Sequence, residues 1–236
     1  MNDFQLHKTQ ASILHSLRYT KAERFSALMH PTNHTSDTFK FHIRKLVKLG
    51  YVTKLENGGY QLTASGKEFA NNLNEEQRRA EKQPKVSILM VLTENNAKGE
   101  TIFLLQKRSR NPFYGYWNEI HGRAKWGESF EATAKRQLKR QTGLDAEFKT
   151  HSFRHVRDYD TNSEKLLEDK LFVILRATKV FGEMTNDYDG GKNAWLTLDE
   201  LRQQDKVFGT TLTILENLDN SEFYYAQDLS YQPEDY

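Results

Sequence analysis

The sequence of 236 residues contains no cysteine and only 4 prolines. Without thiols the chain forms neither a disulfide framework nor a thiolate metal site, and this absence suits a reducing compartment. No apolar run approaches the ~20 residues that a membrane-spanning helix needs. The opening segment, MNDFQLHKTQ, lacks the apolar stretch of a secretory signal. We therefore expect a cytoplasmic protein without a membrane partner.

Charge is distributed unevenly along the chain, although the formal net charge is only +2. Residues 1–83 carry thirteen Lys and Arg against eight Asp and Glu, whereas residues 84–236 carry twenty-one against twenty-four. A basic front half and a mildly acidic back half indicate two domains with different partners, the alternative being chance variation. The length allows two modest domains or one large one.

The front of the chain combines amphipathic helical patterns with one hairpin. Helices are predicted over residues 4–18 and 21–29, and a third over residues 36–49. Ser36 is the expected cap of the third helix, because its hydroxyl can accept hydrogen bonds from the first amides, and Gly50 is its expected end. YVTKL, ENGG and YQL then form a hairpin signal, and LTASGKEFANNL begins a further helix.

This order of elements resembles a winged helix-turn-helix domain, and KLVKLGYVTKLENGGYQLTASGKEFA is similar to that family in some detail. The resemblance covers about residues 4–80 and implies that the third helix enters the DNA major groove. The alternatives are a solvated helix surface and a domain that docks another protein. The candidate contacts to double-stranded DNA are Thr38, Lys40, Phe41 and Arg44 in the groove and Lys45, Lys48 and Lys54 at the phosphates.

A regularly spaced frame occupies the segment GRAKWGESFEATAKRQLKRQTGL, from Gly122 to Leu144. A helix is predicted from about Ser129 to Thr142, with Gly143 as its stop. Dense Ile, Leu and Val before the segment predict two strands around a loop. The residues of the frame are Gly122, Glu128, Arg136, Leu138, Gly143 and Leu144.

The frame resembles the Nudix box, G-x5-E-x7-R-E-U-x-E-E-x-G-U, where U is a bulky aliphatic residue, and the spacing matches without a gap. FLLQKRS with YGYWNEIHG, and later KNAWLTLDELRQ, are also similar to segments of that family. The resemblance covers about residues 85–218 and implies an α/β/α sandwich with a mixed sheet. The chain as a whole is then α+β: a winged helix-turn-helix domain at 1–83, a Nudix-like domain at 84–220, and an acidic, Tyr-rich tail at 221–236 that is either disordered or packed on a neighbour.

The three acidic positions that follow the arginine in the family are Gln137, Arg140 and Gln141 here. At spacings of three and four residues these side chains share one helix face. In active members the acids of this face bind Mg²⁺, which needs hard oxygen ligands, usually carboxylates. Two amides and a guanidinium do not supply them, and Arg140 repels a cation. We therefore expect no metal and no cofactor.

The replacement favours anion binding instead, because a guanidinium binds phosphate bidentately without an ion. The hypothesis is a cleft that holds a phosphorylated metabolite, such as a nucleotide or nucleotide sugar, without cleaving it. The alternative is a relic cleft with no ligand. Glu128 and Arg136 resemble the family pair that holds loop to helix. The candidate ligand-binding residues are Arg140, Gln137, Gln141, Arg136, Lys107, Tyr116 and Trp117.

Together the two halves resemble the Nudix-related transcriptional regulators, with the domain order reversed. The resemblance implies a ligand-sensing, DNA-binding regulator that acts as a homodimer, for which helices 4–18 and 66–80 are the expected surfaces. One alternative is an active Nudix hydrolase that cleaves a nucleoside diphosphate linked to another group. It would use Mg²⁺ and displaced acids at Glu128, Glu131 and Glu119, with Glu164, Glu168 and Asp169 as further candidates from nearby segments. Another is a pure interaction protein whose two modules dock other proteins.

Overall fold

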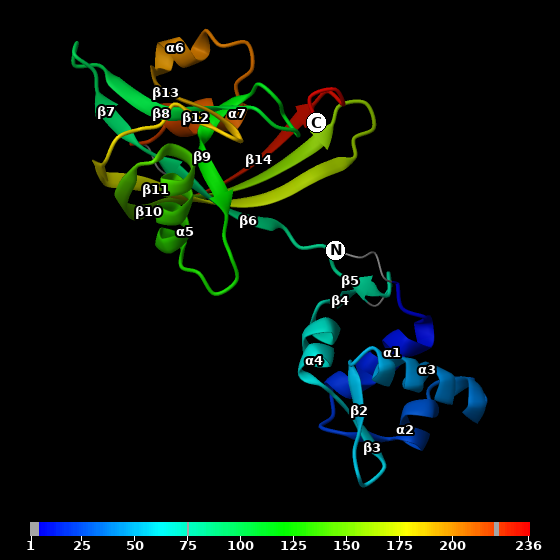
Figure 1. Cartoon of the computed structure of the whole chain (residues 1–236). Helices are drawn as coiled ribbons and strands as arrows, with labels where there is room; N and C mark the ends of the chain where they lie inside the picture. Colours follow the sequence, from blue (N-terminus) through cyan, green and yellow to red (C-terminus); the bar gives the residue numbers. More distant parts are fainter. Residues whose placement is uncertain (1–4, 75, 220–221) are drawn as a thin grey trace. The chain divides into compact units, whose positions relative to one another are not determined.

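The computed structural model describes residues 5–74, 76–219 and 222–236, and the chain divides into two compact units, Met1–Lys82 and Gln83–Tyr236 (Figure 1). Within the described residues no helix is both long and apolar enough to cross a membrane. The boundary at residue 82 lies where Pro84 and a polar, charged segment mark the end of the first set of predicted elements.

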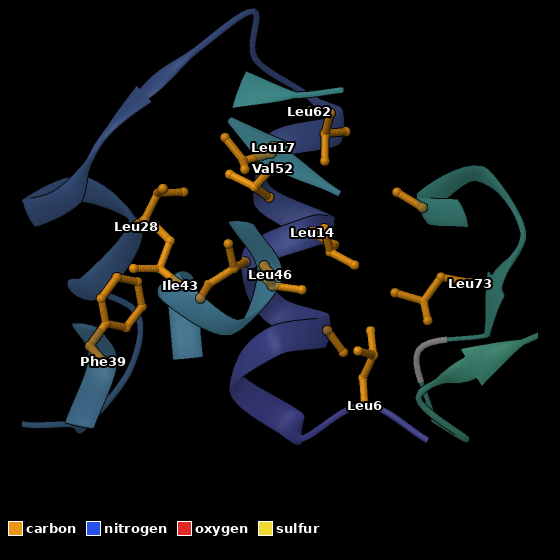
Figure 2. Close-up of a cluster of buried hydrophobic side chains, with 13 residues drawn as sticks. Leu6, Leu14, Leu17, Leu28, Phe39, Ile43, Leu46, Val52, Leu62 and Leu73 are labelled. Atoms are coloured by element: carbon orange, nitrogen blue, oxygen red, sulfur yellow. The ribbon is translucent and has the colours of Figure 1, made fainter. Parts of the chain in front are cut away.

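The first unit packs its helices against a small sheet, in the order β1-β3-β2. Its core consists of apolar side chains from every helix and from the hairpin, as Figure 2 shows for ten labelled residues. The elements are α1 (Lys8–Arg18), β1 (Glu23–Arg24), α2 (Phe25–Met29), α3 (Ser36–Lys48), β2 (Val52–Lys54), β3 (Gly59–Leu62), α4 (Ala64–Asn71), β4 (Leu73–Asn74) and β5 (Arg79–Ala80).

Helix α3 is defined by a capping residue at its start, a glycine after its end and a buried apolar face. Its cap is Thr35, one residue before the Ser36 that the sequence suggested, because the Thr35 side chain accepts from the Thr38 amide. Gly50 follows the helix at φ 75°, a left-handed conformation that favours glycine. Phe39 and Ile43 are buried at 0% and 1% exposure against the rest of the core.

The predicted helix over residues 66–80 is wrong. Helix α4 ends at Asn71, and the chain turns back through Gln77, whose amide donates to the Asn74 side chain, to form the β4–β5 hairpin. Leu73 is 7% exposed in the core, so the chain must leave the helix axis to bury it. The helix predicted over 4–18 begins at Lys8, and residues 1–4 lie outside the described residues.

Three histidine rings lie close together near the starts of α1 and α3, and those of His7 and His42 are stacked. The rings of His7 and His42 lie 4.2 Å apart between centroids, and His34 lies 5.7 Å from His42. His7 caps α1 by accepting from the Thr9 amide, and His34 is 2.6 Å from the Thr9 hydroxyl. Burial, followed by the charges of His7, His34 and Lys45, lowers the pKa of His42.

The first unit should therefore lose stability as the pH falls. The unfolded chain protonates His42 near its ordinary pKa of 6.5, whereas the folded unit resists that proton, so stability rises with pH through this window. We expect His42→Gln to flatten the pH dependence of hydrogen exchange in α1 and α3 between pH 7.5 and ~5. His30→Gln, at an exposed position, is the matched control. An unchanged slope in the His42 variant would contradict this origin.

The second unit is a nine-stranded mixed sheet with helices on both faces. The strand order is β12-β13-β8-β9-β6-β11-β10-β14, with β7 beside β8. The β11–β6 and β10–β14 pairs are parallel and the others are antiparallel. The elements are β6 (Lys85–Val91), β7 (Thr93–Asn95), β8 (Thr101–Arg108), β9 (Trp117–Arg123), α5 (Phe130–Thr142), β10 (Asp145–Asp160), β11 (Leu166–Phe181), β12 (Asp187–Tyr188), β13 (Gly191–Thr197), α6 (Leu198–Arg202), α7 (Gly209–Glu216) and β14 (Tyr224–Tyr231).

Strand β6 shows how the sequence supports two covered faces. Ile88 and Met90 pack with α5, whereas Leu89 and Val91 pack with α6 and α7 on the opposite face. Successive strand residues point to opposite faces, so a strand covered on both sides is continuously apolar, as SILMVL is. The predicted mixed sheet with helices on both sides is therefore confirmed for this unit.

The segment that we expected to be a separate tail at 221–236 belongs to this sheet. Residues 220 and 221 lie outside the described residues, but β14 pairs with β10 over its whole length. Tyr231 is 9% exposed, and its ring packs on Phe113. Leu229 and Tyr231 alternate with polar residues, which is a strand pattern. The acidic, Tyr-rich composition of the segment does not reveal this pattern.

Candidate ligand-binding site

A cavity of about 460 Å³ opens in the second unit, where α5, α7 and the strands β6, β9, β10 and β11 meet. Its lining holds six cations against three carboxylates, a formal excess of three positive charges. The cations are Lys85, Arg108, Arg110, Arg123, Arg140 and Lys170, and the carboxylates are Glu119, Asp158 and Glu168. The cavity therefore suits an anion.

Two of the carboxylates are paired with lysines that also line the cavity. Lys85 donates to Glu168, and Lys170 donates to Asp158, whose side chain is fully buried. Burial raises the pKa of Asp158, and the adjacent Lys170 opposes that rise. Once these pairs are set aside, the remaining positive charge belongs to four arginines.

The arginines reach the cavity from three directions. Arg140 comes from α5, donates to the Gln137 side chain at 2.8 Å, and lies 5.5 Å from the Tyr188 ring centroid. Arg108 ends β8 and donates to the Pro112 carbonyl at 2.8 Å. Burial, followed by the charge of Arg110, lowers the pKa of Arg108 to about 10, so it stays charged at neutral pH. Arg123 is the exposed last residue of β9.

The predicted cluster of Gln137, Arg140 and Gln141 does meet at one place, although only the first two line the cavity. The side-chain amide oxygen of Gln137 accepts hydrogen bonds from both Arg140 and Gln141. Gln141 is 1% exposed and donates to the His121 carbonyl at 2.9 Å, so it fastens α5 to β9.

The residues present do not fit Mg²⁺. The amide oxygen of Gln137 faces a guanidinium, and the carboxylates of Asp158 and Glu168 are bound to lysines. Within the described residues no three His, Asp or Glu side chains converge as metal ligands would. A hard divalent cation needs several oxygen donors free of competing cations.

Glu119, which is buried, and His121, which is half-buried, line one wall of the cavity. The Thr211 hydroxyl donates to one Glu119 oxygen at 2.6 Å, and the other oxygen has no partner among the described residues. Burial raises the pKa of Glu119 to about 7 against this hydrogen bond. Burial, followed by the charge of Arg108, lowers the pKa of His121 to about 4, so the imidazole is neutral at pH 7.

Glu128 and Arg136 form an ion pair outside the cavity rather than a part of it. Arg136 donates to both Glu128 oxygens, at 2.7 and 2.6 Å, and the Thr133 hydroxyl donates at 2.8 Å. The Arg136 hydrogen bonds, followed by that of Thr133, lower the pKa of Glu128 to about 2. The pair ties the loop before α5 to the second turn of the helix.

The remaining predicted site residues lie away from the cavity lining. Lys107 points to the opposite side of β8 from Arg108, because strand residues alternate. Tyr116 donates to Asp235 at 3.1 Å, and Trp117 packs in the core. Glu131 is exposed in the first turn of α5. Of the acids considered for the hydrolase alternative, Glu119 and Glu168 line the cavity, and Glu168 is bound to Lys85.

Sequence reasoning did not single out Arg110, Arg123, Lys85 and Lys170. Arg110 lies two residues after the end of β8, and Arg123 is the last residue of β9. Lys85 is the first residue of β6, and Lys170 lies in β11 between Asp169 and Leu171. Their common location depends on the parallel pairing that sets Lys85 opposite Lys170. The chain separation of these two residues leaves no local signal for this pairing.

The comparisons with known proteins agree with the fold. The model of the NUDIX domain matches residues 82–217, so the chain belongs to the NUDIX domain family. A search of curated proteins found no match.

Among solved structures, the mMutator MutT protein from Bacillus halodurans has 20% identity and a TM-score of 0.51, and the match covers 64% of this chain and 93% of that one. The MutT NUDIX hydrolase from Burkholderia pseudomallei has 23% identity and a TM-score of 0.47, covering 57% and 98%. The NUDIX domain of Shewanella oneidensis NrtR, solved with ADP ribose, has 19% identity and a TM-score of 0.49, covering 67% and 98%. At these identities the likeness concerns the fold alone.

The ion pair of Glu128 should contribute stability that disappears in acid. Its pKa is depressed in the folded state, so the contribution is present above the ordinary value of 4.5 and is lost as the pH falls towards 2. We expect Glu128→Gln to lower the melting temperature of the second unit by a few degrees at pH 7, and by less at pH 3. Glu131→Gln, on the same helix and exposed, is the control. Equal melting temperatures for the two variants at pH 7 would refute a stabilising pair.

Proposed function

We propose that this chain is a cytoplasmic DNA-binding transcriptional regulator, and that its Nudix domain binds a phosphorylated metabolite, such as a nucleotide or nucleotide sugar, without cleaving it. The observation that carries the proposal is the cationic cavity in which Arg140 occupies the face where the family places metal-binding acids. A guanidinium holds a phosphate by charge-assisted hydrogen bonds and needs no ion to do so.

The unpartnered acceptors of the cavity support a ligand that also carries hydrogen-bond donors. Asn118, Glu119 and Asp158 line the cavity, and each has a buried side-chain oxygen without a partner among the described residues. Buried polar atoms without partners are costly unless a ligand or water satisfies them. The hydroxyl groups of a sugar or the amino group of a base provide such donors beside the phosphate.

The first unit supports the DNA-binding half of the proposal. Its order of helix, strand, two helices, hairpin and helix is that of a winged helix-turn-helix domain. The candidate DNA-contacting residues are all exposed, on α3 and at the end of β2, and Phe41 among them is 63% exposed. A positive helix face with one aromatic residue suits a groove lined by phosphates. We include in the proposal a homodimer that reads two half-sites.

Ligand binding is tested by calorimetry of the full chain against ADP and UDP-glucose, with and without Mg²⁺. We expect binding that Mg²⁺ does not strengthen. Arg140→Gln should weaken it by about 10-fold or more, because charge-assisted hydrogen bonds contribute about 1.5–3 kcal/mol. Lys135→Gln, which removes a charge from the same helix outside the cavity, should leave the affinity unchanged. Strict dependence on Mg²⁺, or hydrolysis of either probe, would favour the hydrolase instead.

DNA binding is tested by titrating a random duplex with the full chain at increasing salt. We expect the affinity to fall steeply between about 50 and 200 mM salt, because phosphate contacts release counterions. Lys48→Ala should reduce the slope of log affinity against log salt by about 1. Lys67→Ala, an exposed lysine on α4, should leave the slope unchanged. An affinity independent of salt would rule out the phosphate contacts.

A further inference from the structure

Strand β14 forms one edge of the nine-stranded sheet, and its outer side is open. Among residues 5–74, 76–219 and 222–236, no strand other than β10 pairs with it. The Phe153 amide donates to the Phe223 carbonyl, and the Thr161 amide donates to the Tyr231 carbonyl. Odd-numbered residues therefore direct their backbone groups to β10. The even-numbered residues Tyr224, Ala226, Asp228 and Ser230 direct theirs outward.

This edge lacks the features that usually protect an exposed strand. Its sequence, YYAQDLSY, contains no Lys, Pro or Gly, and its register with β10 is continuous, without a bulge. Its one charge, Asp228, is paired with Arg157 by hydrogen bonds of 2.8 and 2.9 Å. Phe223 and Tyr224 expose 65% and 53% of their surface beside it. Such an edge invites another strand.

The strand is complementary to itself in one antiparallel register, centred on Gln227. In this register Tyr224 faces Ser230 of the partner subunit and Ala226 faces the partner's Asp228, so no like charges oppose each other. All four outward residues then form hydrogen-bonded pairs with one another. Shifting the centre to residue 226 or 228 leaves at least one of them without a partner inside the strand, and a centre at residue 228 also brings two aspartates together.

We propose that a second copy of this chain pairs with β14 in that register, so that the two sheets continue across a two-fold axis at Gln227. A second copy is the occupant because a two-fold axis normal to a sheet edge pairs identical strands antiparallel, and this sequence matches itself under that operation. This inference rests on the proposed function only because that function includes a homodimer. What it adds is the surface through which the two copies pair and the register of the two strands.

The first experiment breaks the outward backbone pairing without disturbing β10. Ala226→Pro removes an outward amide, and proline is tolerated on edge strands whose amide faces solvent. By sedimentation velocity of the full chain we expect the variant to be monomeric where the unchanged protein is dimeric, with circular dichroism unaltered. Ala97→Pro is the matched control, because Ala97 is the second residue of the exposed turn closed by the Gly99 amide and the Asn96 carbonyl, a position that suits proline.

The second experiment tests the register, and the absence of cysteine makes it clean. Gln227→Cys places one thiol beside its own copy at a non-hydrogen-bonded pair, where Cα atoms lie ~4.5 Å apart and a disulfide fits. We expect mild oxidation to give a covalent dimer. Ser230→Cys, on the same strand but away from the axis, should give none.

The outcomes separate this proposal from the proposed function. If the Ala226→Pro variant is still a dimer and the Gln227→Cys variant forms no cross-link, the interface lies elsewhere. That result would overturn the β14 pairing and leave the proposed homodimer intact. A chain that is monomeric at all concentrations would overturn both the β14 pairing and the proposed homodimer. If the Ala226→Pro variant is monomeric and still binds ADP at full affinity, the result supports the β14 pairing and shows that ligand binding does not depend on it. The Kd for ADP and the oligomeric state are therefore two separate measurements.

Discussion

The close approach of α5 to β9 is the contact on which the second unit depends. Gly122 has no side chain, and a Cβ there would lie 2.4 Å from the Gln137 side chain, so any larger residue would displace Gln137 from its present position. Gln141 fixes the contact by donating to the His121 carbonyl, and the pair of Glu128 with Arg136 holds the preceding loop. Among the other residues of the frame, Leu138 and Leu144 pack in the core, and Gly143 ends α5 in a left-handed conformation.

The same contact explains how the site could change its chemistry without losing the fold. The side-chain oxygen of Gln137 accepts from Arg140 and Gln141, and Gln141 donates to the His121 carbonyl, so these groups bond to one another and to the backbone. The Gln141 side-chain oxygen has no partner among the described residues. Glutamates packed this closely would repel one another unless a cation neutralised them. Amides and a guanidinium on this helix face carry no such repulsion, and Gln137 and Arg140 line the cavity.

Prediction from sequence worked where a local pattern has one structural solution. Gly50 and Gly143 end their helices in left-handed conformations, and the run around Ile88 and Leu89 is a strand buried on both faces. It failed where burial of one side chain overrode the pattern. Leu73 draws the chain out of the expected helix into a hairpin. The prediction for Lys107 failed for a different reason, because strand alternation places Lys107 on the side of β8 opposite to Arg108, which lines the cavity.

The sequence by itself determined the two-part organisation, the family frame from Gly122 to Leu144, and the absence of carboxylates at Gln137, Arg140 and Gln141, because these depend on residue type and spacing. Only the tertiary structure decided which charges share the cavity and which are already paired. Lys85 and Lys170 become neighbours through parallel strand pairing, and the expected tail becomes the edge strand β14 beside β10. Such contacts join segments distant in the chain, and their energy comes from burial and pairing that no local pattern encodes.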